Sequence, residues 1–464
     1  MQPRTKLHVM RYAREPSTSS AVVIGVRRFA AVVAIVCAAC APTNVPSAAT
    51  AAASTPSVGG PAIGGTSVSC ASFPTLATAS VAPSPAPSGR ALPSPAPPGT
   101  YLFEKSATAL LLYSRGAVRE LSLPAPLSGS RAVLAPDGSA AHAVLADVKA
   151  QRMSLWSSSG AQVALDIPFL GDVGIVSWSP DARHLAIVPD TDRVDAIYFA
   201  GFDQPASRFV PGGLVFDLEW RGADELSFFS ASSRDYPISG ATLWDWRAGE
   251  RPQALVKLDL AGWSAWRSDG AVFAYPAVTA DGTAAVRTLD VTGTAIVGDR
   301  TVLTADDVTR SKESCGWAAK DLKVTFIDWQ GGGLLAVGLH ALGQYDYAVA
   351  VVHEETGLRG IVRSNNSCFI PFAHWARATP ILAVPLFGPE CGETTLLNRT
   401  ALVDKTGTVM REITVPRKGA LLLSDIATWA AIPGENELTV RRVNGPEQRF
   451  VVPIAKFLGW CCAE

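Results

Sequence analysis

The chain carries little charge and almost no excess of either sign. Charged residues make up 17% of its 464 residues, below the ~25% of an average soluble protein. Its 40 lysines and arginines against 41 aspartates and glutamates leave a formal net charge of −1. Proteins that bind nucleic acid present a basic surface to the phosphate backbone, so this composition argues against a nucleic-acid partner.

The sequence also lacks the short motifs of common catalytic and metal sites. It has no Gly-x-Ser-x-Gly turn, no His-Glu-x-x-His helix and no Gly-x-x-x-x-Gly-Lys loop. Its six histidines are scattered, and no Cys-x-x-Cys pair remains once the N-terminal segment is set aside. We therefore predict a protein that holds no metal or cofactor and is not an enzyme.

Long segments with the period of an amphipathic helix are missing after residue 100. Short apolar runs such as 110–113, 242–246 and 347–352 alternate with turn signals instead. Pro-Asp-Gly at 136–138 and Asn-Gly at 444–445 are typical of tight turns between antiparallel strands. The pattern predicts an all-β body over residues 101–464.

The N-terminus has the features of an export signal. The pair Arg27-Arg28 precedes an apolar run over 29–39, which is shorter than the ~20 residues of a membrane span. Ala38-Ala39-Cys40 resembles the end of a bacterial lipobox, although Cys37 stands where that pattern has leucine. We predict that residues 1–40 are a signal peptide and that Cys40 receives a lipid. An ordinary cleaved signal and an uncleaved anchor are the alternatives.

Residues 41–100 are dominated by alanine, proline, serine, threonine and glycine, with Arg90 as the only charge. Such a segment cannot bury enough apolar surface to offset the entropy lost on ordering, so a disordered linker is predicted. Behind a lipidated cysteine it would act as a tether that holds the body away from the membrane. The alternative is a tail without a role.

One pattern recurs in the body roughly every forty to sixty residues: an apolar strand, a tryptophan, a polar turn and a second apolar strand. The clearest copy covers 176–188, and others cover 218–229 and 264–274. A repeat of this length points to a β-propeller, with the tryptophans packing between blades. The residues assigned to the repeated turn are Asp137, Trp178, Asp181, Trp220, Trp266, Asp269, Trp329 and Trp375.

We predict seven blades, with eight or six as alternatives. Residues 101–124 would complete the last blade or join a C-terminal strand at 457–460, which removes an exposed sheet edge. The blades are predicted near 131–170, 175–212, 215–257, 262–303, 325–363, 371–416 and 424–455.

The turn Trp-Ser-Pro-Asp at 178–181, followed by Leu-Ala-Ile-Val at 185–188, resembles the repeat of TolB-like propellers, also called WD40-like repeats. The copies at 135–138 and 266–270 fit less well. The Gly-His and Trp-Asp dipeptides of true WD40 repeats do not occur as a series. The resemblance covers most of 125–390 and implies an exported or envelope protein that works by binding.

Five of the eight cysteines lie in the body, where an exported protein meets oxidising conditions. Structural disulfides are therefore predicted, with free buried thiols as the alternative. We favour a bond between Cys315 and Cys368, in loops of adjacent predicted blades. Cys391 would pair with Cys461 or Cys462, unless these two neighbours bond to each other.

Taken together, the sequence predicts a lipid-anchored binding or scaffold propeller outside the cytoplasm, monomeric, with a protein or glycan of the envelope or the exterior as partner. The alternative is an enzyme that acts on extracellular glycans through paired carboxylates. A propeller of the prolyl oligopeptidase type is disfavoured, because no hydrolase sequence follows residue 464.

Overall fold

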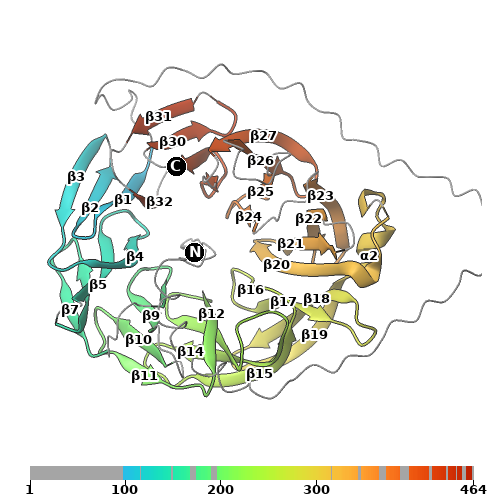
Figure 1. Ribbon diagram of the computed structural model, residues 1–464, viewed down its shortest axis with the longest axis horizontal. Coiled ribbons are helices and arrows are strands. Elements are labelled where there is room, and N and C mark those ends of the chain that lie inside the picture. Colours follow the sequence, from blue (N-terminus) through green and yellow to red (C-terminus); the bar gives the residue numbers. More distant parts are fainter. Residues whose placement is uncertain are drawn as a thin grey trace, which may run out of the picture. The chain divides into compact units, whose positions relative to one another are not determined.

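Eight four-stranded sheets are arranged around a common centre in the part of the chain that the structure describes (Figure 1). The structure is a computed structural model. The predicted signal peptide with Cys40 and nearly all of the predicted linker lie outside the described residues. These are 98–461 without 115, 148–149, 168–173, 190–195, 315, 343–345, 365–371, 387–396, 417–420, 435–436, 446 and 452–455.

The sheets are the blades of a propeller and are numbered here along the chain. Blade 1 contains β1 (Thr100–Ser106), β2 (Ala109–Ser114), β3 (Ala117–Ser122) and the C-terminal β32 (Lys456–Cys461). Blade 2 contains β4 (Leu127–Leu134), β5 (Ala141–Asp147), β6 (Arg152–Ser157) and β7 (Gln162–Leu165). Blade 3 contains β8 (Ile175–Trp178), β9 (His184–Val188), β10 (Ile197–Gly201) and β11 (Ser207–Phe209). Blade 4 contains β12 (Leu214–Trp220), β13 (Glu225–Ala231), β14 (Ile238–Arg247) and β15 (Gln253–Leu260). Blade 5 contains β16 (Ala265–Trp266), β17 (Val272–Val278), β18 (Ala284–Thr292) and β19 (Ala295–Thr304), and blade 6 contains β20 (Leu322–Gln330), β21 (Leu334–Ala341), β22 (Asp346–His353) and β23 (Gly357–Ser364). Blade 7 contains β24 (His374–Trp375), β25 (Leu382–Leu386), β26 (Leu397–Val403) and β27 (Val409–Pro416). Blade 8 contains β28 (Leu422–Leu423), β29 (Trp429–Pro433), β30 (Glu437–Arg442) and β31 (Glu447–Val451).

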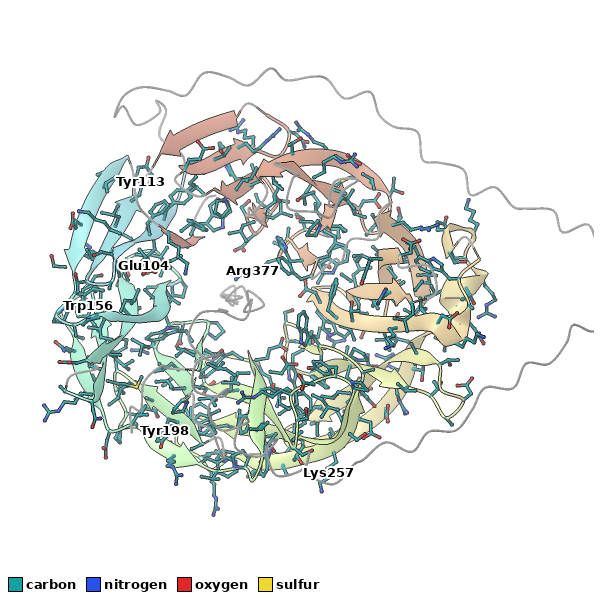
Figure 2. The ribbon with its side chains drawn as sticks, in the orientation of Figure 1. Glu104, Tyr113, Trp156, Tyr198, Lys257 and Arg377 are labelled. Carbon is teal, nitrogen blue, oxygen red and sulfur yellow. The ribbon has the colours of Figure 1, made fainter. Side chains whose placement is uncertain are left out.

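Blades 2 to 8 each begin at the centre of the ring and end at its rim. Figure 2 shows Arg377, which follows the first strand of blade 7, near the centre, and Lys257 of the last strand of blade 4 at the outside. The first strand of each of these blades therefore lines the middle of the ring.

The two ends of the body meet in blade 1. Strand β1 pairs with β2 on one side and with β32 on the other, so that Tyr101 lies opposite both Tyr113 and Trp460. The rings of Tyr101 and Trp460 stack with their centroids 5.8 Å apart. Of the two predicted arrangements for residues 101–124, the structure has the one in which they join the C-terminal strand, and the pairing covers the edge that β1 would otherwise expose.

The predicted number of seven blades is wrong, and the described residues form eight. The seven predicted segments each correspond to a blade. The error concerns residues 101–124, because β28–β31 already supply blade 8 with four strands. Strands β1 to β3 therefore cannot complete that blade, and together with β32 they form one of their own.

Hydrophobic clusters join every blade to its neighbours. Eight such clusters occur in the described residues, and each spans the junction of two adjacent blades. The cluster that closes the ring packs Tyr101 and Tyr113 of blade 1 against Ala431 and Val440 of blade 8. A sheet of alternating side chains has two apolar faces to cover, and in a ring each neighbour covers one of them.

The repeated turn follows the first strand of a blade and has one geometry in four blades. The turn covers 135–138, 179–182, 267–270 and 424–427. Its last residue takes a positive φ, at Gly138 (70°), Ala182 (58°), Gly270 (73°) and Ala427 (56°). Left-handed backbone favours glycine, and the two alanines adopt it at a cost of ~1 kcal/mol each. The copy at 424–427 went unpredicted because no tryptophan precedes it.

A short helical insertion connects blades 5 and 6. It comprises α2 (Ala305–Arg310), η1 (Lys312–Ser314) and η2 (Ala319–Asp321), and α2 begins with a capping box between Thr304 and Asp307. Val308 of α2 and Trp317 pack into the cluster between the two blades. No helix within the described residues is long and apolar enough to cross a membrane.

Candidate functional site

The five tryptophans assigned to the repeat are structural. All are buried, with at most 9% of their surface exposed. The indole N–H of Trp220 donates to Ser177 Oγ of blade 3 at 3.1 Å, and that of Trp329 donates to the carbonyl of Ala265 in blade 5 at 3.0 Å. Trp266 donates in the same way to Ser227 Oγ of blade 4 at 2.5 Å. The side chains of Trp220, Trp266 and Trp329 thus link adjacent blades.

The three assigned aspartates hold their own turns. Each of these aspartates accepts, through a carboxylate oxygen, a hydrogen bond from the backbone N–H two residues further on. The distances are 2.9 Å for Asp137, 3.1 Å for Asp181 and 2.9 Å for Asp269. Hydrogen bonds from Ser139 lower the pKa of Asp137. No group of three histidines, cysteines, aspartates or glutamates in the described part of the chain is placed to hold a metal ion.

Among the cysteines, only Cys461 lies within the described residues, and its sulfur is disulfide-bonded. Cys315, Cys368, Cys391 and Cys462 lie outside them, as does Cys40. The predicted pairings therefore stay predictions.

Carboxylates on the first strands of blades 4 and 6 bind the neighbouring blade. Glu219 Oε1 accepts the backbone N–H of Trp266, and Asp328 Oδ2 accepts that of Trp375, both at 3.1 Å. Each carboxylate directly precedes the tryptophan of its own repeat. Their contacts fit a role in holding adjacent blades in register.

Asp217 differs from these carboxylates in its backbone. It lies within β12 with a φ of 53°, at a bulge in the pairing with β13. Its Oδ2 accepts a hydrogen bond from the hydroxyl of Tyr236 at 3.2 Å. The other described residues that have a positive φ and are not glycine lie outside strands. Strained backbone inside a strand is typical of functional sites, although it does not by itself define one.

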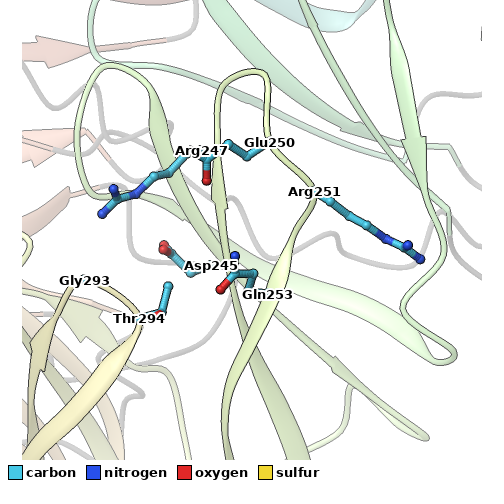
Figure 3. Close-up of a pocket in the computed structure, with 7 residues that line it drawn as sticks. All are labelled: Asp245, Arg247, Glu250, Arg251, Gln253, Gly293 and Thr294. Atoms are coloured by element: carbon cyan, nitrogen blue, oxygen red, sulfur yellow. The ribbon is translucent and has the colours of Figure 1, made fainter.

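A polar recess of about 190 Å³ lies where two hairpins of blades 4 and 5 meet (Figure 3). The β14–β15 hairpin contributes most of the lining, and the β18–β19 hairpin of blade 5 contributes the rest. This volume is below the ~300–1,000 Å³ of a drug-sized site, so the recess suits one small group. Its lining residues are Asp245, Arg247, Glu250, Arg251, Gln253, Gly293 and Thr294.

The floor of the recess is fixed by a buried ion pair. Asp245 is 3% exposed, and its Oδ1 accepts from Arg221 Nη1 at 2.8 Å. The Nε and Nη2 atoms of Arg221 donate to the carbonyl of Gly270 in blade 5, and its guanidinium lies 4.3 Å from the ring centre of Trp266. Burial raises the pKa of Asp245, while the Arg221 charge opposes that rise.

The rim is less completely paired. Arg247 Nη2 lies 3.1 Å from Glu225 Oε1, but Arg247 Nε is buried and has no hydrogen-bond partner among the described residues. Glu250 and Arg251 are exposed. In Figure 3 the Arg251 side chain points away from Asp245. The recess therefore has a fixed acceptor at its floor and, at its rim, one guanidinium whose Nε is unpaired among the described residues.

Sequence reasoning did not find this recess. The one sequence feature at this place is an isolated Trp-Asp dipeptide, Trp244-Asp245, which by itself indicates no site. The lining residues come from hairpins of different blades and form no motif along the chain.

Comparisons with known proteins found similarity at the level of the fold. No family model matches the chain, and no curated protein matches it either. Among solved structures, dihydro-heme d1 dehydrogenase NirN in complex with DHE is similar over 79% of this chain and 75% of its own, at 12% identity and a TM-score of 0.49. Apo AztD from Citrobacter koseri is similar over 77% and 95%, at 12% identity and a TM-score of 0.46. Dipeptidyl peptidase 4 of Porphyromonas gingivalis is similar over 72% and 60%, at 11% identity and a TM-score of 0.46.

At these identities the likeness shows the β-propeller fold alone, and the resemblance to TolB-like repeats stays a prediction. One prediction needs correction. The prediction that the protein is not an enzyme does not stand, because the solved structures of similar fold include a dehydrogenase and a peptidase, so this fold does not exclude catalysis. A propeller of this kind therefore does not indicate a protein without catalysis.

Proposed function

We propose that the protein is exported, anchored through a lipid on Cys40 at the bacterial cell envelope, and serves there as a binding or scaffold propeller. Its ligand or partner meets the face of the ring that carries the hairpins of blades 4 and 5. The observation that supports binding is the recess between these hairpins, with Asp245 fixed at its floor and Arg247 Nε unpaired among the described residues.

The N-terminal sequence supports the location. An apolar run behind Arg27-Arg28 leads to Ala-Ala-Cys at 38–40, and a spacer rich in proline and alanine follows up to residue 100. A fixed ring on a long tether can reach partners some distance from the membrane, since proline-rich chains extend by ~3.1 Å per residue.

Mass spectrometry of the N-terminal peptide, together with membrane fractionation, tests the anchor. We expect a diacylglyceryl group on Cys40 and the protein in the membrane fraction, and Cys40→Ala should release it. An unmodified peptide that starts at Ala41 or later would contradict the anchor. Pulldown of partners from solubilised membranes with the mature protein tests the binding role, which fails if nothing is retained beyond the level of an unrelated lipoprotein.

Asp217 supports a second candidate function, the cleavage of extracellular glycans through carboxylates on the first strands. Its left-handed backbone inside a strand is a strain that a catalytic carboxylate would explain. Release of reducing ends from envelope glycans tests this candidate. We expect Asp217→Asn to abolish release while Asp203→Asn, on the surface of blade 3, leaves it intact. Equal release from both variants would exclude Asp217 as the carboxylate.

A further inference from the structure

We infer that the recess between blades 4 and 5 binds a neutral, hydroxyl-rich group of about the size of one sugar unit. The inference rests on the proposed function, since it names the ligand class for the face assigned there to binding.

The charges of the recess favour a neutral ligand. Its lining contains two carboxylates, Asp245 and Glu250, and two guanidinium groups, Arg247 and Arg251. Behind the lining, Arg221 pairs with Asp245 and Glu225 pairs with Arg247, so the second layer is balanced as well. A phosphate or carboxylate ligand requires an excess of positive charge, and a cation requires an excess of negative charge. This recess supplies neither.

The hydrogen-bonding groups of the recess match hydroxyls. Carboxylates accept hydrogen bonds only, guanidinium groups donate only, and the Gln253 amide and the Thr294 hydroxyl do both. A sugar hydroxyl also does both, so neighbouring hydroxyls of one ring can satisfy a mixed lining of this kind. Among the described residues, no apolar or aromatic side chain lines the recess, so hydrogen bonds rather than apolar contact would hold the ligand.

An unsatisfied buried donor gives the site a specific driving force. Arg247 Nε is buried without a hydrogen-bond partner in the described part of the chain. The Arg247 side chain as a whole is 41% exposed, so a small shift of its guanidinium on binding would let a ligand hydroxyl accept from Nε and satisfy that donor. The buried pair of Arg221 and Asp245 holds the floor in place, so little ordering is needed on binding.

The test is saturation-transfer NMR on the full chain in a detergent without sugar head groups. The probes are glucose, galactose and N-acetylglucosamine, with inorganic phosphate as an anionic competitor and glycine as a zwitterionic one. We expect transfer to at least one sugar with millimolar affinity, corresponding to ~4 kcal/mol, and no displacement by either competitor. Displacement by phosphate or glycine would overturn the neutral-ligand assignment, and the absence of transfer to any of the three sugars would overturn it too.

Variants locate the binding site. Glu250→Gln and Gln253→Ala should each weaken sugar binding about tenfold, the loss of a hydrogen bond of ~1.5 kcal/mol. Glu355→Gln, an exposed change on blade 6, is the matched control and should bind as the wild type does. Unchanged binding in both recess variants would place the sugar elsewhere and contradict the inference. Mass spectrometry of Cys40 is independent of this result, so failure of the sugar site and failure of the anchor can be told apart.

Discussion

Arg221 and Asp245 form a buried ion pair at the junction of blades 4 and 5, with 2.8 Å between Nη1 and Oδ1 and with the Arg221 side chain only 5% exposed. The remaining donors of the same guanidinium bind the carbonyl of Gly270 across the junction. A single side chain thus fixes the floor of the recess and ties two blades together.

Breaking this pair from one side should be costly. Arg221→Ala leaves Asp245 buried without its partner, and we expect the free energy of unfolding to fall by ~3–5 kcal/mol. The double variant Arg221→Met, Asp245→Leu removes both charges and should lose less. Urea denaturation of the three proteins measures the difference. A double variant less stable than Arg221→Ala would show that the pair is not what stabilises the junction.

The hydrogen bond from Trp220 to Ser177 should behave as a link between blades 3 and 4. Trp220→Phe removes the indole donor and Ser177→Ala removes the acceptor, and each should cost ~1 kcal/mol. In a double-mutant cycle the combined loss should be smaller than the sum of the two, because both changes delete the same bond. Additive losses would mean that the two side chains act independently.

His374 should make stability depend on pH in a defined window. Burial lowers its pKa from the ordinary 6.5 to about 4. The unfolded chain therefore binds a proton at a higher pH than the folded chain does, and stability is lost as the pH falls from about 6.5 to about 4, by ~3 kcal/mol in full. Burial also lowers the pKa of His142 and His340, so part of the slope has other origins. His374→Gln should be less sensitive to pH than the wild type across this window. Identical slopes for the two proteins would contradict the role of His374.

Asp217 should show the cost of a left-handed residue inside a strand. Asp217→Gly and Asp217→Ala both lose the hydrogen bond from Tyr236, but only glycine adopts a φ of 53° without strain. We expect the glycine variant to be about 1 kcal/mol more stable than the alanine variant. Thermal unfolding compares them, and an alanine variant of equal or higher stability would show that the backbone relaxes there.

The local features of the fold could be predicted from the sequence because they depend on neighbouring residues. The turn at 179–182 encodes its own hydrogen bonds, and Trp178 directly before it marks the end of a first strand. The number of blades could not be predicted from neighbouring residues. It depends on whether the strands after Tyr101 complete a neighbour or recruit β32, and that choice is made by packing.

The recess lay beyond sequence reasoning for a similar reason. Asp245 and Thr294 belong to hairpins of different blades, and only the docking of those blades brings them to one cavity. The ion-pair partner of the buried Asp245 is also distant in sequence, since Arg221 lies 24 residues before it. No pattern of residue types along the chain marks such a site.

Removal of β32 tests the closed ring most directly. A chain that ends at Ala455 keeps every other strand but leaves β1 without its second partner and Tyr101 without Trp460. Because it also lacks the disulfide-bonded Cys461, the full chain compared with it carries Cys461→Ala. If eight blades close through this pairing, the thermal midpoint should fall by several degrees, and a synthetic peptide covering 456–461 should restore it. A truncated protein that melts at the temperature of the full chain, with or without the peptide, would contradict a ring closed by its two ends.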